Sequence, residues 1–390
     1  MKYSSKYLIK ELLGNGLLSI VTLIISFIFN LYIARVLDIR DYGIYELELT
    51  IGTLFALFIA FATDGYAAKI FSKKKNELSV FNQVLSTKLF LFTISLLFII
   101  IFKPSILLPF TAICISTINL GWLYEIRKLN SYFSKILVFE KIIFVALGFT
   151  LVLFFSKTKE SIFTALLIAN SLSILFQYYL NKNLLKQYKI SILNKQDLFN
   201  CISLLLVSIF EYINGGISKF FISENLNLES VAIYSLALKV LILGTVFQSQ
   251  VVKIFRPLFF QNNKNPFNLY FIFTTLPTLF LAILIYFLFP FYVGFFSSDY
   301  STLIDFALPC ALFFIIINLR SLFTILYTKY EKLNINLYIV IFIGSLKVLF
   351  LSFIKITSSL MLIYSLLTIE TIGILTLFYW IKKNEKSLFN

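Results

Sequence analysis

Twelve apolar segments of membrane-spanning length constrain the fold of this chain more than any other feature. A helix needs about 20 mostly apolar residues to cross the hydrocarbon core of a bilayer. Lipid offers no partner to unpaired backbone groups, so each such segment has to form a helix. The predicted spans are 12–35, 42–63, 86–102, 105–124, 136–155, 161–180, 198–222, 230–252, 267–289, 302–328, 333–354 and 358–381. The sequence therefore predicts an all-α integral membrane protein.

The composition supports this class. Charged residues make up 14% of the chain, whereas a soluble domain carries about 25%. The net charge of +15 reflects the basic bias of cytoplasmic loops rather than nucleic-acid binding. The chain contains no histidine, which excludes His-based metal sites and catalytic triads. Cys114, Cys201 and Cys310 lie inside apolar segments and are expected to act as small hydrophobic residues, so no metal site is predicted.

Lys and Arg are unevenly distributed between the loops. With a cytoplasmic N-terminus, the cytoplasmic segments hold 22 of these residues and the outward turns hold six. Because basic loops stay on the cytoplasmic side, this bias predicts an even number of spans and two cytoplasmic termini. All loops are short, so we expect no soluble catalytic domain and a function inside the membrane.

A polar linker, 181–197, divides the chain into an N-terminal lobe, 1–180, and a C-terminal lobe, 198–390, with six predicted spans each. A shift of 189 positions aligns residues 37–49 with 226–238, and five of these thirteen positions are identical. Chance similarity between two apolar helices is the alternative to duplication. A duplicated chain of this topology would place two parallel repeats around an axis normal to the membrane.

Ionisable residues inside the predicted spans are candidate functional residues. A charge at bilayer depth costs about 2.5–3.5 kcal/mol and usually faces a cavity or a partner. Lys219, Lys239 and Arg320 each lie well inside an apolar run, and we expect them to face a polar lumen and bind an anionic group such as phosphate. Arg35 is a further basic candidate, although its place near a span end also allows it to snorkel. The acidic candidates are Glu46, Glu48, Asp64, Glu211 and Glu370.

Structural interpretations of these charges remain open. Glu211 and Lys219 are eight residues apart on one helical face, so they could pair with each other. Glu140 and Lys141 are expected to lie near a membrane interface.

The stretch from Leu37 to Phe71 carries the most specific motifs. They are Tyr42-Gly43-Ile44-Tyr45 in a charged turn, Tyr32 to Arg35 at the end of the preceding span, and Ala67-Ala68-Lys69 after the second span. These motifs resemble those of the polysaccharide transporters, the O-antigen repeat-unit flippases of the multidrug/oligosaccharidyl-lipid/polysaccharide exporter superfamily. Lys69 stands where that family more often has arginine.

This resemblance implies a MATE-like fold with two six-helix lobes and a cavity lined by the first, second, seventh and eighth spans. It implies a bacterial inner-membrane flippase that moves undecaprenyl-pyrophosphate-linked oligosaccharide to the outer leaflet by alternating access. The basic candidates would hold the pyrophosphate, and the acidic ones would be candidate carriers of a coupling proton or sodium ion. No other cofactor is implied, and the expected partners are membrane lipids and the glycosyltransferases and polymerase of the same pathway.

Other functions remain as alternatives. A drug/cation antiporter of the same superfamily would favour acidic over basic cavity residues. A polytopic glycosyltransferase would use carboxylates in the first outward turn, where Asp38 and Asp41 lie, but it usually has long outward loops. Asp41 is more simply interpreted as the N-cap of the helix that follows.

Overall fold

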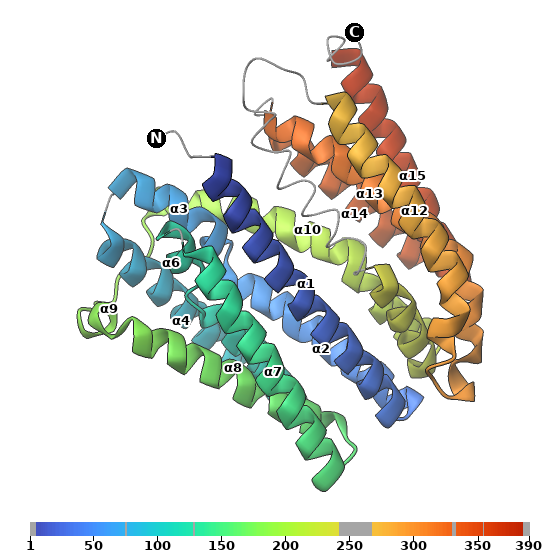
Figure 1. The fold of residues 1–390 in the computed structure, drawn as a ribbon, viewed down its shortest axis with the longest axis horizontal. Coiled ribbons are helices and arrows are strands. Elements are labelled where there is room, and N and C mark those ends of the chain that lie inside the picture. The colour runs from blue at the N-terminus through green and yellow to red at the C-terminus, as the bar shows by residue number, and fades with distance from the viewer. Residues whose placement is uncertain are drawn as a thin grey trace. The chain divides into compact units, whose positions relative to one another are not determined.

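The computed structural model describes residues 5–74, 76–127, 129–241, 267–329, 333–353 and 355–384. Within these ranges the chain forms helices joined by short connections, and no β-strand occurs (Figure 1). Eight helices of the described residues are long and apolar enough to cross a membrane, and two parts of α10 that meet at 48° would form a ninth. The predicted all-α membrane fold is confirmed.

The first six predicted spans coincide with helical segments. These are α1 (Ser5–Val36), α2 (Ile39–Ala60) with its extension α3 (Thr63–Lys74), α4 (Glu77–Phe102), the series η1 (Pro104–Ile106), α5 (Leu107–Cys114), η2 (Ile115–Ile118) and α6 (Gly121–Ile126), then α7 (Asn130–Phe154) and α8 (Lys159–Leu180). The fourth predicted span is therefore a series of short helices. Asn119 explains one break: its amide donates to the Ser116 carbonyl and its oxygen accepts from the Gly121 N–H, which replaces helical bonds.

The predicted spans of the second half also coincide with helical segments where the structure describes them. After the short α9 (Lys182–Lys186), its elements are α10 (Lys195–Asn225), a helix over 228–241, α12 (Phe267–Val293), η3 (Ser298–Phe306), α13 (Ala307–Lys329), α14 (Leu333–Phe353) and α15 (Ser359–Asn384). Most of the predicted span 230–252 lies outside the described residues. The other five predicted spans in this half fall on these helical segments, and 302–328 covers both η3 and α13.

The chain divides into two compact units. The first unit comprises Met1–Leu37 and Tyr45–Ile209, and the second comprises Asp38–Ile44 and Phe210–Asn390. The first turn of α2 is thus grouped with the C-terminal half, and the first half of α10 with the N-terminal half. The lobe boundaries read from the sequence stay a prediction.

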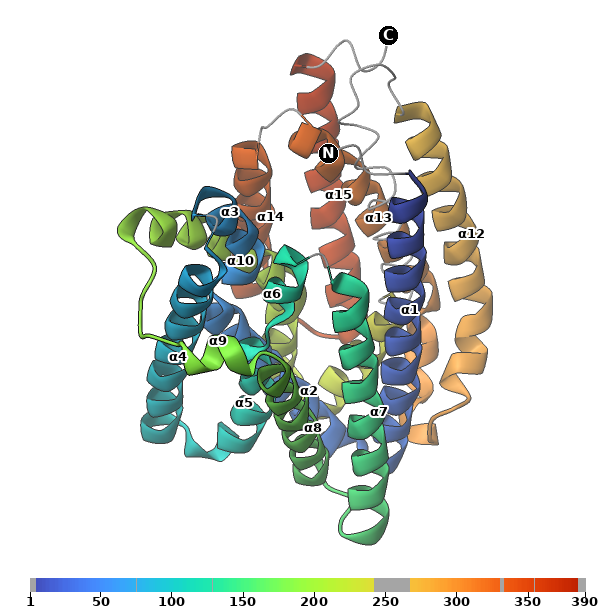
Figure 2. The same cartoon turned by 60° about the vertical axis from the view of Figure 1, so that its left-hand side comes forward.

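In the first unit, α7 packs between α1 and α8, and α5 packs on α8 (Figures 1 and 2). The α1–α7 contact is tight: a Cβ added to Gly148 would lie 2.2 Å from the Phe29 ring. Phe29 also meets Phe144 edge to face, with 4.9 Å between the ring centroids. Burial of these aromatic rings holds α1 against α7.

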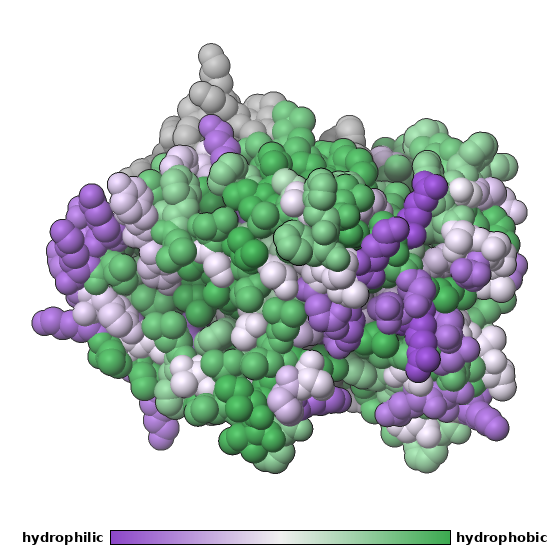
Figure 3. Space-filling view, turned by 90° about the horizontal axis from the view of Figure 1, so that it is seen from below, coloured by the Kyte–Doolittle hydropathy of each residue, from purple (hydrophilic) through white to green (hydrophobic). Residues whose placement is uncertain are grey.

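Large apolar side chains cover much of the face shown in Figure 3. Exposed examples from three different helices or their ends are Phe102, Phe155 and Phe353. Soluble monomers rarely expose apolar patches larger than a few hundred square ångströms. A surface of this kind suits contact with lipid acyl chains.

Two helix starts share one capping arrangement. Asp38 Oδ1 accepts the backbone N–H of Asp41 at 2.8 Å at the start of α2. Asn227 Oδ1 accepts the N–H of Ser230 at 2.7 Å at the start of the helix over 228–241. The prediction that Asp41 is the N-cap was wrong, because Asp38 supplies the capping oxygen. Asp38 and Asn227 are 189 positions apart, which is the shift that aligns the two sequence segments, so the shared cap supports the duplication.

A left-handed break separates α2 from α3. Phe61 and Ala62 have φ angles of 49° and 53°, which side chains other than glycine rarely adopt. Next to the break, the buried ammonium of Lys88 on α4 bonds Asp64 Oδ1 at 2.5 Å and the Thr117 carbonyl at 2.7 Å. Lys88 thereby ties the start of α3 to α4 and η2, and this helps to hold the strained backbone in place.

The far side of α3 is tied to the start of α10. The Tyr66 hydroxyl donates to Asp197 at 3.3 Å and accepts from the Asn200 amide at 2.7 Å. Burial, reinforced by the Asp197 carboxylate, raises the pKa of the Tyr66 phenol above its usual value. The phenol is protonated at neutral pH and donates to Asp197.

The break gives a stability prediction. Glycine adopts positive φ freely, so Ala62→Gly should raise the free energy of unfolding by about 0.5–1 kcal/mol after its greater entropy in the unfolded chain is subtracted. Thermal unfolding of the purified protein in detergent measures this. Ala68→Gly is the matched control, because Ala68 is exposed in the interior of α3 and should lose about 1 kcal/mol. A lower melting temperature for Ala62→Gly than for the wild type would contradict the interpretation that the positive φ angle of Ala62 strains the backbone.

Candidate functional site

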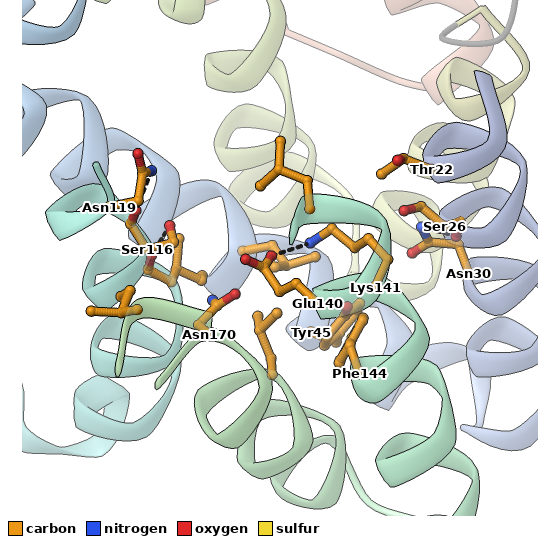
Figure 4. A pocket seen from close by; sticks show the side chains of 15 residues that line it. Thr22, Ser26, Asn30, Tyr45, Ser116, Asn119, Glu140, Lys141, Phe144 and Asn170 are labelled. Atoms are coloured by element: carbon orange, nitrogen blue, oxygen red, sulfur yellow. Dashed lines mark hydrogen bonds and ion pairs between the residues drawn. The ribbon is translucent and has the colours of Figure 1, made fainter. Parts of the chain in front are cut away.

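Residues of the first unit line a partly open cavity of about 440 Å³ (Figure 4). Its walls come from α1, α2, α5 with η2, α7 and α8, which all belong to predicted spans. The polar side chains in the wall are Thr22, Ser26, Asn30, Tyr45, Ser116, Asn119, Glu140, Lys141 and Asn170. A polar wall inside membrane-spanning helices is costly unless it meets water, a partner or a ligand.

Helical spacing brings these side chains to one place. Thr22, Ser26 and Asn30 follow one another at intervals of four residues, so they form a polar stripe along α1. Asn30 donates its amide to the Ser26 carbonyl at 2.8 Å, a bond that stays within this stripe. On α7, Glu140 and Phe144 have the same spacing and form the part of the wall next to this stripe (Figure 4).

Asn170 on α8 is the most constrained polar residue of the wall. Its side chain is 3% exposed, and its amide donates to the Ala112 carbonyl at 2.8 Å. Its Oδ1 atom is buried and accepts no hydrogen bond from the described residues. Figure 4 shows this oxygen on the side of the carboxamide that faces Glu140. A buried acceptor without a donor costs about 1–3 kcal/mol, so a ligand that donates to Oδ1 recovers that cost.

The charges of the wall balance each other. Lys141 Nζ lies 3.2 Å from Glu140 Oε1 and 5.9 Å from the centre of the Phe144 ring. Glu140 is 8% exposed and stands at the eleventh position of the 25-residue helix α7. How deep this pair lies in the membrane stays a prediction. One carboxylate and one ammonium leave the described wall without net charge.

The nine charged residues predicted from the sequence are all absent from the described wall of this cavity. Three acidic candidates are instead ion-paired at 2.5 Å: Glu48 with Lys159, Asp64 with Lys88, and Glu370 with Lys347. Glu46 is buried in α2, and the side chain of Glu211 lies outside the described ones. Whether any of them carries a coupling ion stays a prediction.

The basic candidates differ in their surroundings. Lys239 donates to the Tyr42 hydroxyl at 2.6 Å, and its Nζ lies 5.1 Å from the centre of the Tyr42 ring. Arg35 is exposed in the last turn of α1, and Lys219 is half-buried in α10. The side chain of Arg320 lies outside the described ones. Their contact with an anionic substrate stays a prediction.

Sequence reasoning passed over the cavity residues because most of them are uncharged. The signal that could have revealed them is the stripe Thr22, Ser26 and Asn30, which runs along one face of an otherwise apolar span. Asn170 has no such local signal. Among the described residues, no three His, Cys, Asp or Glu side chains are grouped closely enough to hold a metal ion.

A family sequence profile identifies the protein family of the chain. The family described as "Polysaccharide biosynthesis protein" matches residues 8–263. The chain belongs to this family. The resemblance seen in the Tyr-Gly turn and its flanking motifs is therefore confirmed. No curated protein sequence matches the chain significantly.

Solved structures show the fold of this family member. An inward-facing multidrug resistance MATE family transporter of the MOP superfamily aligns with a TM-score of 0.71 at 12% identity, covering 94% of this chain and 95% of that chain. An outward-facing one aligns with a TM-score of 0.69 at 13% identity, covering 98% and 96%. A MATE in complex with MaD3S gives 0.64 at 13% identity, covering 97% and 96%. The predicted MATE-like fold is confirmed.

Proposed function

We propose that this protein is a flippase that moves undecaprenyl-pyrophosphate-linked oligosaccharide from the inner to the outer leaflet of the bacterial inner membrane. The family match carries this proposal. A polysaccharide-pathway protein whose described residues form membrane-spanning helices and short connections needs a substrate that is itself anchored in the membrane. Lipid-linked repeat units have that property.

The substrate explains why the protein has polar groups at membrane depth. Sugar hydroxyls and a pyrophosphate lose their hydration in hydrocarbon, which is too costly for unaided crossing. The basic residues Lys219, Lys239, Arg320 and Arg35 hold the pyrophosphate, while the polyprenyl tail stays in lipid. Alternating access moves the head group, driven by a proton or sodium gradient, and the termini face the cytoplasm. Glycosyltransferases deliver the substrate and a polymerase receives it.

A drug/cation antiporter is the second candidate, because the similar solved structures include multidrug transporters. A site for an organic cation needs an uncompensated carboxylate in its wall. Glu140 is the carboxylate in the described cavity wall, and Lys141 neutralises it. This balance disfavours cation binding in the cavity.

Loss of a predicted phosphate contact tests the flippase directly. Lys239→Met keeps the apolar stem but removes the charge, so it should reduce surface polysaccharide about tenfold and cause lipid-linked precursor to accumulate. Polysaccharide blots and precursor extraction measure this at matched membrane abundance. Lys186→Met is the control, because Lys186 is exposed in α9 and should change nothing. Normal display in Lys239→Met, Lys219→Met and Arg320→Met alike would refute phosphate binding by these residues.

A further inference from the structure

We propose that the cavity of the first unit is a subsite for an uncharged sugar residue of the lipid-linked substrate, with Asn170 Oδ1 accepting a hydrogen bond from a sugar hydroxyl or amide. This inference rests on the proposed flippase function and assigns a role to a site whose described wall contains none of the predicted phosphate-binding residues. Lys219, Lys239 and Arg320 belong to the second unit, whereas the residues of the cavity wall belong to the first. Arg35 belongs to the first unit but is not part of the described wall.

The unpaired oxygen of Asn170 defines the hydrogen-bonding requirement of the ligand. The Asn170 amide is already engaged by Ala112, so the carboxamide is held in one orientation and offers an acceptor. The bound group must therefore carry a donor, and a sugar hydroxyl or acetamido N–H is such a donor. A phosphate without protons is not.

Charge balance selects against an anionic ligand. The pairing of Lys141 with Glu140 leaves the described wall with no excess positive charge. A pyrophosphate placed there would lose its hydration without a matching cation, which is strongly unfavourable. An uncharged polyhydroxylated group meets no such penalty.

The remaining wall combines polar and aromatic side chains, which suits a sugar ring with its polar edges and apolar C–H faces. Thr22, Ser26 and Asn30 bring polar groups from α1, while Tyr45 and Phe144 bring aromatic surface (Figure 4). Ligand sites commonly combine apolar walls with a few polar groups that fix orientation. A sugar ring has apolar C–H faces and polar edges. A cavity of about 440 Å³ falls within the usual range for small-molecule sites.

Binding to the purified full chain in lipid nanodiscs tests the subsite. The probes are free glucose, galactose, N-acetylglucosamine and N-acetylgalactosamine, with glucuronate and inorganic pyrophosphate as anionic comparisons. At least one uncharged sugar should raise the melting temperature of the wild type. Its apparent affinity should fall about tenfold in Asn170→Leu and in Asn30→Leu, because each variant removes a hydrogen-bonding side chain from the wall.

Asn82→Leu is the matched control. Asn82 is also a buried asparagine, 8% exposed, whose Oδ1 accepts no bond from the described residues, but it lies on α4 outside the cavity wall. This variant should bind sugar like the wild type. If Asn170→Leu does not fold, Asn30→Leu provides the same comparison. Equal affinities in all four proteins, or no stabilisation by any uncharged sugar, would overturn the subsite.

Transport in proteoliposomes separates this inference from the function on which it rests. With undecaprenyl-pyrophosphate-linked N-acetylglucosamine, Asn170→Leu should need a higher substrate concentration for half-maximal flipping, whereas Asn82→Leu should not. Wild-type flipping without any Asn170-dependent sugar binding would overturn the subsite alone. Asn170-dependent sugar binding without flipping would overturn the flippase and support the subsite, and uptake of free sugar would show that the bound sugar is not lipid-linked.

Discussion

Gly43→Ala is expected to destabilise the protein by about 3 kcal/mol or more, or to prevent folding. The added methyl group has no room, because the backbone of Leu228 lies directly against Gly43. A Cβ on Gly43 would lie 2.0 Å from the Leu228 carbonyl oxygen and 2.8 Å from its carbonyl carbon. Both atoms are backbone, so neither can turn away as a flexible side chain would. Size-exclusion profiles and thermal unfolding of the purified protein measure the loss.

Gly215→Ala is the control for this substitution. No atom lies within 4 Å of a Cβ at position 215, and the residue is exposed within α10. Alanine there should leave stability unchanged or raise it by up to about 1 kcal/mol, since alanine favours helix more than glycine. Equal stabilities of the two variants would show that Gly43 does not need the close approach to Leu228.

Breaking the buried pair of Lys347 and Glu370 should have the second large effect. Lys347 on α14 is 1% exposed, Glu370 on α15 is 3% exposed, and Nζ lies 2.5 Å from Oε1. Removal of one partner strands the other charge away from water, which typically costs 3–5 kcal/mol. Lys347→Met and Glu370→Met should each lower the melting temperature strongly in detergent and reduce the yield of folded protein.

The double variant Lys347→Met/Glu370→Met tests whether the unpaired buried charge causes the loss of stability. With both charges replaced by methionine, most of the lost stability should return, because burying two apolar side chains in place of an ion pair is often neutral or stabilising. Glu77→Gln offers a comparison, since Glu77 and its partner Arg127 are both about one-third exposed, so the loss of this pair should cost less. Additive losses in the Lys347 and Glu370 double variant would show that the two residues do not stabilise each other.

The span positions were predictable because they depend on local properties. A bilayer demands a minimum apolar length and full backbone hydrogen bonding, and both can be read along the chain. Eleven of the twelve predicted spans fall on described helical segments, and most of the remaining one, 230–252, lies outside the described residues. The series from η1 to α6 shows the limit, since side-chain bonds of Asn119 interrupt a segment whose apolar length alone predicts one helix.

The partners of the charged residues were not predictable in the same way. Glu48 and Lys159 are 111 positions apart, yet they pair at 2.5 Å. Sequence reasoning treated the acidic residues as candidate coupling groups, because the sequence shows that a charge at membrane depth is costly. The sequence does not show which residue pairs with that charge. A charge inside a span signals a partner or a cavity, and the sequence does not say which.

The sequence by itself determined the membrane class, the succession of spans, the similarity between residues 37–49 and 226–238, and the Tyr-Gly turn that marks the family. Each of these depends on composition, on the order of residues within one segment, or on the comparison of two such segments. Only the tertiary structure decided that Lys347 meets Glu370, that Gly43 meets Leu228, and that side chains from α1, α2, α5, η2, α7 and α8 line one cavity. Such contacts depend on how each helix is rotated toward its neighbours, and packing between distant segments sets that rotation.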